Sequence, residues 1–397
     1  MVAAFEGLRV LDVSQGVPGA LCAMQMGDLG ADVIKLEPLQ GDWLRQIGPF
    51  VKGESALFLQ LNRNKRGVAV DLKKPEGVGI ALKLVSAADV LVEAYRPGVM
   101  DNLGLGYEAL ERLNPRLIYC SVSGLGSKGR LAELPGSEIV VQGIMGYYRR
   151  FGVLGESPVR AGADLASIGA GIDALQGVAA SLYWREKAGR GQKVDVSLLG
   201  SLSSVSNLMY TYESNPMDGW TGDTHLAAYT DPPNYGYETK DIPMDFTFQR
   251  DEEAWGKFLK AMGLERLAGD PRFSDQRKRG QNKETLKPIL EEVLRTRTYE
   301  ELRRLIQDEL GGTIVPMHNY DSLFAHEQVK AMDIVKEMDH PTVGKFKTLN
   351  VPWDFQDTPA TLRLPPPLLG QHTDEVLSEL GLSQRDIGVL REKQVVR

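Results

Sequence analysis

The regular pattern of the chain begins with Leu8-Arg-Val-Leu-Asp-Val13, which is followed, after a helical stretch opening near Pro18, by Asp32-Val-Ile-Lys-Leu36. Short, mostly apolar runs are typical of strands covered on both faces, and a proline suits the first turn of a helix. Strand, helix and strand in this order build a unit of parallel strands. The alternation continues to residue 123, so we expect an α/β domain, with further strands at Gly67–Leu72, Asp89–Glu93 and Arg116–Ser123 and further helices at Pro75–Ala87 and Tyr107–Leu113.

The longest periodic segment is Asp164–Lys187, in which apolar residues recur on one helical face and several glycines and alanines allow close packing. A strand is expected at Lys193–Leu199. From about Asn215 to Gly236 the composition changes to Pro, Gly, Asp and Thr, which indicates a linker. A second unit and a tail follow, in which we expect a strand at Met244–Gln249 and helices at Glu253–Met262, Lys283–Arg295, Tyr299–Leu310 and Thr373–Gly381.

The composition is that of a turn-rich globular protein. Of the 397 residues, 42% are hydrophobic and 25% are charged, which disfavours a disordered or collagen-like chain. We find no apolar run that approaches the length of a membrane span. The net charge of −7 supplies no global positive field, so we expect binding to neither nucleic acid nor an anionic membrane.

Cysteine and histidine are scarce. Cys22 and Cys120 are the only cysteines, and the five histidines lack the spacing of a zinc site. We therefore expect neither a disulfide framework nor a bound metal. The first residues lack a basic region followed by an apolar stretch, so the sequence predicts a cytoplasmic protein.

The segment Gly124-Leu-Gly-Ser-Lys-Gly129 follows an expected strand and has the glycine spacing of a dinucleotide-binding loop. Such a loop needs a helix that opens at its third glycine, so that the helical amides face the pyrophosphate. Pro135 and Gly136 follow too soon for that helix. We interpret the segment as a plain glycine loop.

Basic residues gather near several expected strand ends. Three of them occur within Asn62–Arg66, directly before an expected strand, and Lys35, Lys73 and Arg96 lie at or just after other strand ends. The carboxyl ends of parallel strands form the ligand crevice of an open sheet. These residues are therefore candidates for neutralising a polyphosphate, and a solvated charged turn is the alternative.

Asp164 is expected at the start of the long helix. A carboxylate there can cap the first helical amides, and it can also serve as a nucleophile because a helix N-terminus favours its charged form. Glu138 is either a solvated loop carboxylate or a site residue. Tyr147–Arg150 is either a surface turn or the wall of an anion pocket, and Gln15 is either a loop residue or a polar contact in the crevice.

Taken in order, several motifs resemble the class III CoA-transferase family, which includes formyl-CoA transferases, carnitine CoA-transferases and α-methylacyl-CoA racemases. The resemblance covers nearly the whole chain, and the ordered set is far more specific than any one motif. The motifs are Gly7-Leu-Arg-Val-Leu-Asp12, Leu29-Gly-Ala-Asp-Val-Ile-Lys-Leu-Glu37, Asn64-Lys-Arg66 with Asp71-Leu-Lys73, Arg96-Pro-Gly98 with Leu103-Gly104, Asn114-Pro-Arg-Leu-Ile-Tyr-Cys-Ser121, Arg185-Glu-Lys-Ala-Gly-Arg-Gly-Gln192 and Leu369-Gly-Gln-His-Thr-Asp-Glu-Val-Leu377.

The resemblance implies a large Rossmann-like domain, made from the N-terminal half and the C-terminal tail, with a smaller α+β domain inserted. It also implies a homodimer of two interlocked chains. The expected boundaries are residues 1–215 for the first part of the large CoA-binding domain, 216–240 for a linker, 241–330 for the small domain and 331–397 for the return linker and the rest of the large domain.

The resemblance also implies a chemistry in which Asp164 is the nucleophile. Asp164 would attack an acyl-CoA thioester, hold the acyl group as an anhydride and then hold CoA as an aspartyl thioester. Glu138 and Gln15 are implied as further catalytic residues, and CoA thioester acts as a co-substrate, with no tightly bound cofactor. Contacts to CoA are implied for Lys35, Arg66, Val70, Lys73, Arg96 and Asn102, and contacts to a dicarboxylate acceptor are expected for Tyr147, Arg149, Arg150 and Arg160.

Departures from the family pattern separate its branches. In racemases a histidine takes part in proton transfer where this chain has Ser137, so a two-base racemase would lack one base. Val17 and Pro38 stand where formyl-CoA transferases carry a glutamine and an arginine, which disfavours formyl-CoA and oxalate. CoA transfer between organic acids is therefore our preferred hypothesis. The alternatives are an α-methylacyl-CoA racemase or epimerase and a non-catalytic CoA-binding partner subunit.

Overall fold

The computed structural model describes residues 2–150, 157, 159–206, 236–248 and 251–397, and these residues form two compact units. The larger unit combines the N-terminal part of the chain with its C-terminal tail. Residues 146–160, which we expected in the large domain, group with the smaller unit instead. The larger unit consists of Met1–Met145, Ala161–Asn207 and Gln328–Arg397, and the smaller of Gly146–Arg160 and Leu208–Glu327.

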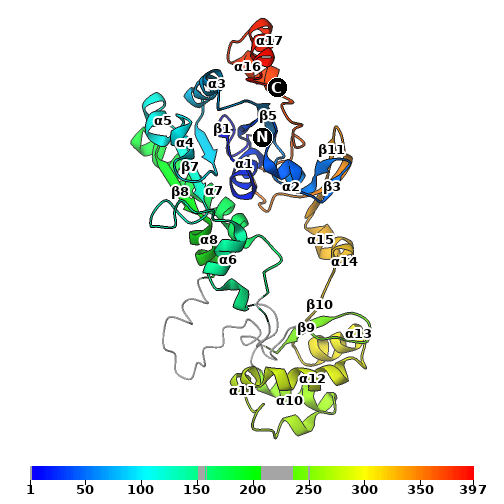
Figure 1. The fold of residues 1–397 in the computed structure, drawn as a ribbon. Helices are drawn as coiled ribbons and strands as arrows, with labels where there is room; N and C mark the ends of the chain where they lie inside the picture. The colour runs from blue at the N-terminus through cyan, green and yellow to red at the C-terminus, as the bar shows by residue number, and fades with distance from the viewer. Residues whose placement is uncertain (1, 151–156, 158, 207–235, 249–250) are drawn as a thin grey trace. The chain divides into compact units, whose positions relative to one another are not determined.

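A six-stranded parallel sheet forms the centre of the described part of the larger unit (Figure 1). Its strand order is β5-β2-β1-β6-β7-β8. Numbered among the parallel strands alone, this is the order 3-2-1-4-5-6 of a doubly wound nucleotide-binding fold. The predicted parallel α/β sheet is confirmed, with strands β1 (Arg9–Asp12), β2 (Asp32–Glu37), β5 (Lys65–Ala69), β6 (Val90–Glu93), β7 (Ile118–Ser123) and β8 (Lys193–Ser197).

The strand β5 begins two residues earlier than expected, at Lys65 instead of Gly67. Lys65 and Arg66 pair with Val33 and Ile34, near the start of β2. They therefore lie at the amino ends of the strands, opposite the edge where an open parallel sheet binds ligands. The geometry therefore does not support our placement of this basic run in the ligand crevice, because Lys65 and Arg66 open β5 and its carboxyl end is at Ala69.

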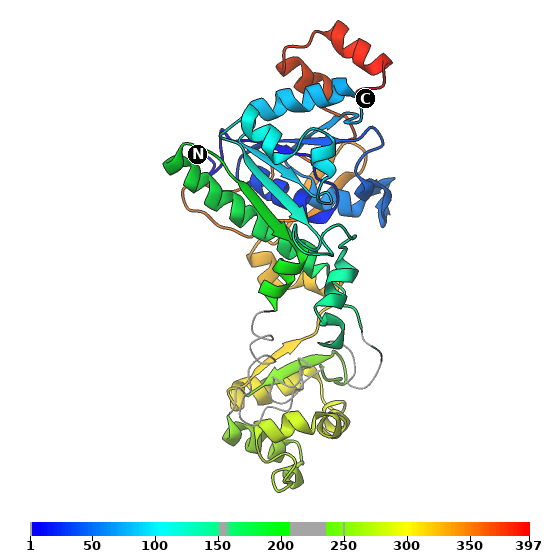
Figure 2. The same ribbon diagram turned by 60° about the vertical axis from the view of Figure 1, so that its left-hand side comes forward.

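Helices cover both faces of the sheet (Figure 2). Helices α3 and α5 share one hydrophobic core with the C-terminal helices α16 and α17. On the other face, α1 and α7 pack closely against each other. The helices of this unit are α1 (Val17–Asp28), α2 (Ala56–Leu61), α3 (Pro75–Ser86), α4 (Val99–Asn102), α5 (Tyr107–Leu113), α6 (Glu138–Ile144), α7 (Leu165–Ala188), α8 (Leu198–Val205), α16 (Thr373–Glu379) and α17 (Gln384–Glu392).

The close approach of α1 and α7 depends on Gly171. A Cβ atom at this position would lie 2.8 Å from the carbonyl oxygen of Pro18 and 2.9 Å from the Cβ of Leu21. Both distances are shorter than ordinary van der Waals contacts, so glycine is required where the two helices cross. The glycine-rich pattern of the long helix therefore has a packing reason.

Helix α7 is also the one described helix whose length and composition would allow it to cross a membrane. We had expected no apolar run of that length. Its contacts with α1, β7 and β8 are those of a helix in the core of a domain, and such helices meet the same criteria.

The smaller unit contains the antiparallel pair β9 (Met244–Thr247) and β10 (Thr313–Pro316), packed against short helices. Its core is aromatic, and the ring of Phe258 contacts the rings of both Phe246 and Trp255. The part of the expected linker that runs from Asn215 to Tyr235 lies outside the described residues. The helices are α10 (Glu252–Ala261), α11 (Gln276–Gln281), α12 (Lys283–Leu294), α13 (Tyr299–Arg303) and α14 (Tyr320–Ala325), and a π-helical turn at Arg304–Glu309 continues α13.

Several elements had no counterpart among our expected elements. They are two hairpins in the larger unit, the strand β10, and the helices α2, α4, α6, α8, α11, α14, α15 (Glu327–Ala331) and α17. The hairpins are β3 (Phe50–Val51) with β4 (Glu54–Ser55), and β11 (Val335–His340) with β12 (Gly344–Leu349).

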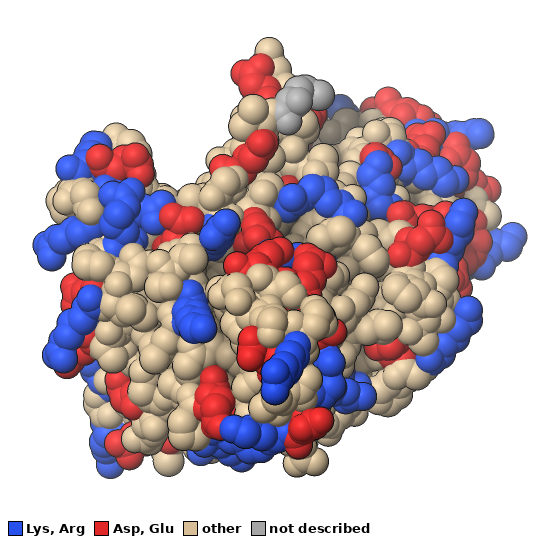
Figure 3. Space-filling view, turned by 90° about the horizontal axis from the view of Figure 1, so that it is seen from above, with Lys and Arg blue, Asp and Glu red and all other residues tan. Residues whose placement is uncertain are grey.

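Basic and acidic side chains alternate across the face drawn in Figure 3, and no wide field of one sign appears on that face.

We expect Gly171→Ala to lower the free energy of unfolding by about 1–3 kcal/mol, because the new methyl group would push α1 away from α7. Gly79→Ala in α3 is the matched control, since nothing lies within 4 Å of a Cβ built there. Helix propensity alone should make that variant up to ~1 kcal/mol more stable. Urea unfolding followed by circular dichroism measures both changes, and equal shifts in the two variants would contradict the tight crossing.

Candidate active site

Asp164 is the residue that directly precedes the first turn of α7. Its backbone carbonyl accepts a hydrogen bond from the amide of Ile168, at 2.9 Å, so the helical pattern begins at Asp164 itself. Its side chain makes no capping hydrogen bond to the helix. The capping role that we considered for this carboxylate is therefore performed by another group.

That group is Glu138, the first residue of α6. Its Oε1 accepts a hydrogen bond from the amide of Ala166, at 2.9 Å, and its Oε2 accepts from the amide and the hydroxyl of Ser167, at 2.8 and 2.7 Å. Gln142, one helical turn later, donates to Oε1 at 2.7 Å. Glu138 is thus a buried carboxylate at the start of α7, and the interpretation as a solvated loop residue was wrong.

The electrostatics of Glu138 suit this role. Burial raises the pKa of the carboxyl group, but the hydrogen bonds from Ala166, Gln142 and Ser167 outweigh it and hold the pKa below its ordinary value of 4.5. The positive end of the α7 dipole favours the same charged form. Glu138 is therefore ionised at neutral pH, and its hydrogen bonds hold the protein backbone in place.

Gln142 is a site residue that the sequence did not reveal to us. Besides its bond to Glu138, its side-chain amide donates to the carbonyl of Ala163, at 3.3 Å. One turn of α6 thus holds the chain on both sides of Asp164. The only sequence signal was the spacing of four residues between Glu138 and Gln142, which places two side chains on one helical face.

Gln15 follows β1 at the point where the strand order of the sheet reverses, between β1 and β6. Ligands of doubly wound sheets bind at this point. The side-chain amide of Gln15 donates to the hydroxyl of Tyr95, at 3.2 Å, and the backbone amide of Tyr95 donates to Glu93 at 2.8 Å. The side chains of Gln15 and Tyr95 therefore bridge the crevice. Our sequence analysis did not identify Tyr95 as a candidate site residue.

The helix crossing brings the two parts of the site to one end of the larger unit. Gly171 contacts Pro18, which lies in the first turn of α1 and shortly after Gln15. Asp164 precedes Gly171 by seven residues, or roughly 10 Å at 1.5 Å per residue. The starts of α1 and α7, with Gln15 and Asp164, therefore lie at the same edge of the sheet.

Residues 5–373 match the family described as CoA-transferase family III. The chain belongs to this family. It is 32% identical over 395 residues to human succinyl-CoA:glutarate CoA-transferase, covering 98% of this chain and 89% of that protein. It is 30% identical to the beta subunit of succinyl-CoA–L-malate CoA-transferase from Chloroflexus aurantiacus, covering 98% and 97% of the two chains. The crystal structure of a CAIB/BAIF family protein from Brucella suis aligns with a TM-score of 0.82 at 29% identity, covering 96% of this chain and all of that one.

The chain is therefore a class III CoA-transferase, and acyl-CoA thioesters are its co-substrates. Within the described part of this transferase, no group of three or more histidine, cysteine or carboxylate side chains could hold a metal ion. The glycine loop at Gly124–Gly129 has no helix at its third glycine, because the next helix begins at Glu138.

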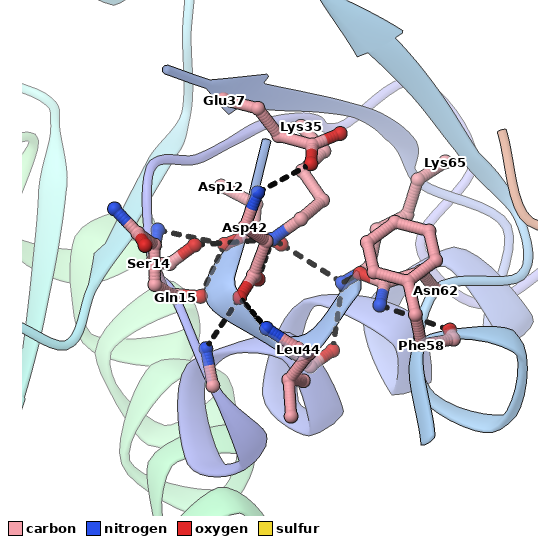
Figure 4. A network of polar contacts seen from close by, with 12 residues as sticks. Asp12, Ser14, Gln15, Lys35, Glu37, Asp42, Leu44, Phe58, Asn62 and Lys65 are labelled. Atoms are coloured by element: carbon pink, nitrogen blue, oxygen red, sulfur yellow. Dashed lines mark hydrogen bonds and ion pairs between the residues drawn. The ribbon is translucent and has the colours of Figure 1, made fainter. Parts of the chain in front are cut away.

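Lys35, which we predicted to contact CoA, is completely buried in the transferase. Its ammonium group lies 3.0 Å from Asp42 and 3.6 Å from Asp12, and it donates to the carbonyl of Ser14 at 3.0 Å (Figure 4). Because these contacts are all to buried groups of the protein, the geometry favours a structural role. Its contact with CoA stays a prediction.

Arg66 is bound to three carboxylates. It forms a two-pronged pair with Asp32, at 2.7 and 3.0 Å, and reaches Glu375 and Glu379 of α16, at 2.9 and 2.7 Å. These contacts join the start of β5 to α16 in the C-terminal tail. Its predicted contact with CoA likewise has no support from the geometry.

The other predicted CoA contacts differ in exposure. Val70 is completely buried, and its amide donates to the carbonyl of Glu37 at 2.8 Å. Lys73, Arg96 and Asn102 are exposed and follow the carboxyl ends of β5 and β6. These three are placed where a ligand in the crevice can meet them, and their binding to CoA stays a prediction.

A cavity of about 370 Å³ opens beside Arg96. Its walls carry more carboxylates than cations, so it does not suit a phosphate group. The acidic side chains are those of Glu93, Asp101, Glu108 and Asp195, and the basic ones are those of Arg96 and Lys193.

The predicted acceptor contacts belong to the smaller unit. Tyr147–Arg150 form a short 3₁₀ helix, and the side chains of Arg149 and Arg150 lie outside the described residues. Arg160 is exposed. Their contact with an acceptor acid stays a prediction.

We expect Glu138→Ala to lower kcat on the order of 100-fold, because the start of α7 and Asp164 would shift once the cap is lost. Glu138→Gln keeps one acceptor and should cost about tenfold. Glu133→Ala, in the exposed loop before α6, is the matched control and should leave kcat unchanged. Steady-state kinetics decides, and full activity of Glu138→Ala would contradict the positioning role.

The lowered pKa of Glu138 also predicts a pH dependence of stability. The ionised group stabilises the folded state above its ordinary pKa of 4.5, and this stabilisation is lost as the pH falls through the lower pKa of the folded state. Thermal melting should therefore separate wild type from Glu138→Gln at pH 7 and bring them together in acid. A gap between their melting temperatures that is independent of pH would argue against an ionised Glu138.

Proposed function

We propose that this transferase moves CoA from an acyl-CoA donor to an organic acid, with Asp164 as the nucleophile. The observation that carries the proposal is that Glu138 and Gln142 of α6 hold the backbone on both sides of Asp164, at the start of α7. A carboxylate whose backbone is held on both sides has the properties of an oriented nucleophile.

In the proposed first half-reaction, a carboxylate oxygen of Asp164 attacks the carbonyl carbon of the donor thioester. The carbon–sulfur bond breaks, CoA leaves as the thiolate, and the acyl group stays on Asp164 as a mixed anhydride. The thiolate then attacks the aspartyl carbonyl and releases the donor acid as a carboxylate. Asp164 now carries CoA as a thioester.

In the second half-reaction, the acceptor carboxylate attacks the carbonyl carbon of the aspartyl thioester. This attack forms a second mixed anhydride, between Asp164 and the acceptor, and frees the CoA thiolate. The thiolate attacks the acceptor carbonyl of this anhydride, and the products are the new acyl-CoA and free Asp164. Each attack develops an oxyanion that nearby N–H groups can stabilise. We assign one such donor to the side-chain amide of Gln15, whose other N–H is directed to Tyr95.

We further propose that the acceptor is a dicarboxylate. The human relative is named for succinyl-CoA and glutarate, and the Chloroflexus relative for succinyl-CoA and L-malate. The second carboxylate of such an acid needs a cationic partner, and Tyr147, Arg149, Arg150 and Arg160 are our candidates. Transfer from one carboxyl to the other within a single dicarboxylate would use the same residues.

Trapping of the intermediates tests the nucleophile. With acyl-CoA and hydroxylamine, we expect a hydroxamate on residue 164 in peptides analysed by mass spectrometry, and we expect Asp164→Ala to lose at least ~10⁴-fold in kcat. Asp173→Asn, on the same helix, is the control and should keep both the label and the activity. The absence of a hydroxamate together with full activity of Asp164→Ala would sink the proposal.

A comparison of glutarate with pentanoate, which has the same chain length and one carboxylate fewer, tests the acceptor class. A lost hydrogen bond to a charged group corresponds to about 10–100-fold, so Arg160→Ala should raise KM for glutarate by that factor and leave KM for pentanoate unchanged. Arg160→Lys should restore part of the affinity. Equal kcat/KM for both acids in the wild type would contradict a dicarboxylate preference.

The racemase alternative is tested in the same preparation. Ser137 is the residue before α6, and its hydroxyl cannot replace an imidazole base. Deuterium that enters the α-carbon of a branched acyl-CoA without any acceptor would revive that alternative. Because one relative is named a beta subunit, turnover should be measured with this chain expressed alone.

A further inference from the structure

Two aspartates and two lysines are buried together around Asp12, at the carboxyl end of β1 (Figure 4). Asp12, Lys35, Asp42 and Lys65 have no exposed surface. They come from β1, β2, the turn before the 3₁₀ helix at Trp43–Gln46, and β5. We call these four residues the buried ion network.

Lys65 is held by three acceptors. Its ammonium group donates to Asp12 at 2.8 Å, to the carbonyl of Ala20 at 2.9 Å and to the side chain of Asn62 at 2.9 Å. An ammonium group has three N–H donors, so all of them are used. Lys65 thereby ties Asp12 to the first turns of α1.

The charges of the network balance, as buried charges must. Lys35 lies between Asp12 and Asp42, and Lys65 lies against Asp12. Burial raises the pKa of Asp12, but the two lysines outweigh it and the pKa is lowered. Burial lowers the pKa of Lys65 to about 8, which leaves it protonated at pH 7.

The carboxylates of the network also hold the loop between β1 and α1. Asp12 accepts hydrogen bonds from the amide and the hydroxyl of Ser14, at 3.0 and 2.5 Å, and Asp42 accepts from the amide of Gly16 at 3.2 Å. Lys35 donates to the carbonyl of Ser14. The residues on both sides of Gln15 are therefore fixed by buried charges.

The loop conformation itself allows little adjustment. Gly16 has a φ of 81°, in the region that favours glycine, and a Cβ there would lie 2.5 Å from the ring of Trp43. Asp42 also accepts from the amide of Leu44 at 2.9 Å, so the same carboxylate fixes the turn that carries Trp43. The carboxylate of Asp42 thus fixes two neighbouring backbone segments through hydrogen bonds.

Stability alone explains such a network poorly. Replacement of a buried ion pair by apolar residues of similar size is often neutral or stabilising, so four charges in one core point to a demand for a defined geometry. The backbone that these charges define is the one that carries Gln15 at the strand-order reversal, where Gln15 meets Tyr95.

We propose that the buried ion network of Asp12, Lys35, Asp42 and Lys65 positions the Ser14–Gly16 loop, and through it Gln15, for the transfer reaction. The four are positioning residues, and Lys35, which resembles a CoA contact in sequence, acts from inside the protein. This inference rests on the proposed function, because Gln15 acts there on the thioester.

Two substitutions at one position separate charge from hydrogen bonding. Asp42→Asn and Asp42→Ala both remove the charge beside Lys35, but only Asp42→Ala removes the acceptor of the Gly16 amide. A displacement of about 1 Å in a reacting group can cost on the order of 100-fold, so we expect Asp42→Ala to lose about that factor in kcat. Asp42→Asn, which keeps the shape of the residue and is the variant more certain to fold, should lose about tenfold.

Asp28→Asn is the matched control. Asp28 is as deeply buried as Asp42 and forms a two-pronged pair with Arg63, at 2.9 and 2.7 Å, but it lies at the other end of α1 from the loop. Its loss should lower the melting temperature and change kcat by less than about twofold. If Asp28→Asn and Asp42→Asn lose stability and kcat in parallel, the network is structural only and the proposal is overturned.

The decisive kinetic readout is the double variant with Gln15. If the network acts through Gln15, Asp42→Asn should cost less than about twofold in kcat once Gln15→Ala is present. An unchanged tenfold loss in that background would overturn the proposal. KM for acyl-CoA should change less than kcat in all of these variants.

A structural readout works without turnover. Hydrogen–deuterium exchange in the peptide that contains Ser14 and Gly16 should be at least about tenfold faster in Asp42→Ala than in the wild type, and unchanged in Asp28→Asn. Unchanged exchange in both variants would overturn the positioning role. If the wild type moves no CoA while the loop still loosens in Asp42→Ala, the proposed function fails and the loop anchoring stands.

Discussion

The start of α7 sets the constraint on which the rest of the site depends. The first amides of any helix have no partner inside the helix, and at a buried end another group must accept from them. Here that group is Glu138, which belongs to a different helix and binds Ala166 and Ser167. Because the Glu138 carboxylate joins α6 to α7, the start of α7 that carries Asp164 is fixed to α6.

Much of the sheet could be predicted because its strands are local apolar runs. The run at Leu8–Val13 contains β1, the run at Asp32–Leu36 covers β2 except for its last residue, and the alternation of strands and helices indicated that the strands are parallel. The start of β5 was missed because Lys65 looks like a loop residue in sequence. Its charge is neutralised by Asp12, 53 residues away, and no local pattern reports such a partner.

Site residues could be predicted only where the residue type and its place in the sequence were enough to identify them. Asp164 lies at the start of the long helix, as the glycine-rich pattern indicated, and Glu138 lies beside it. The contacts of Lys35 and Arg66 were not predictable, because a cation in a strand looks the same whether it meets a ligand or a buried carboxylate. The roles of Gln142 and Tyr95 depend on contacts between elements that the sequence does not bring together.

The division of labour that we propose for the two carboxylates, with Glu138 as the cap and Asp164 as the nucleophile, has a chemical reason. A nucleophile that is acylated loses its negative charge, and a cap that loses its charge weakens the hydrogen bonds from the helical amides, at a cost of about 1 kcal/mol. If Asp164 capped α7 itself, the helix end would loosen each time the anhydride or thioester formed. With Glu138 as the cap, α7 would keep its hydrogen bonds while Asp164 changed its covalent state in the proposed reaction, so the backbone that carries the proposed intermediate would stay in place through both half-reactions.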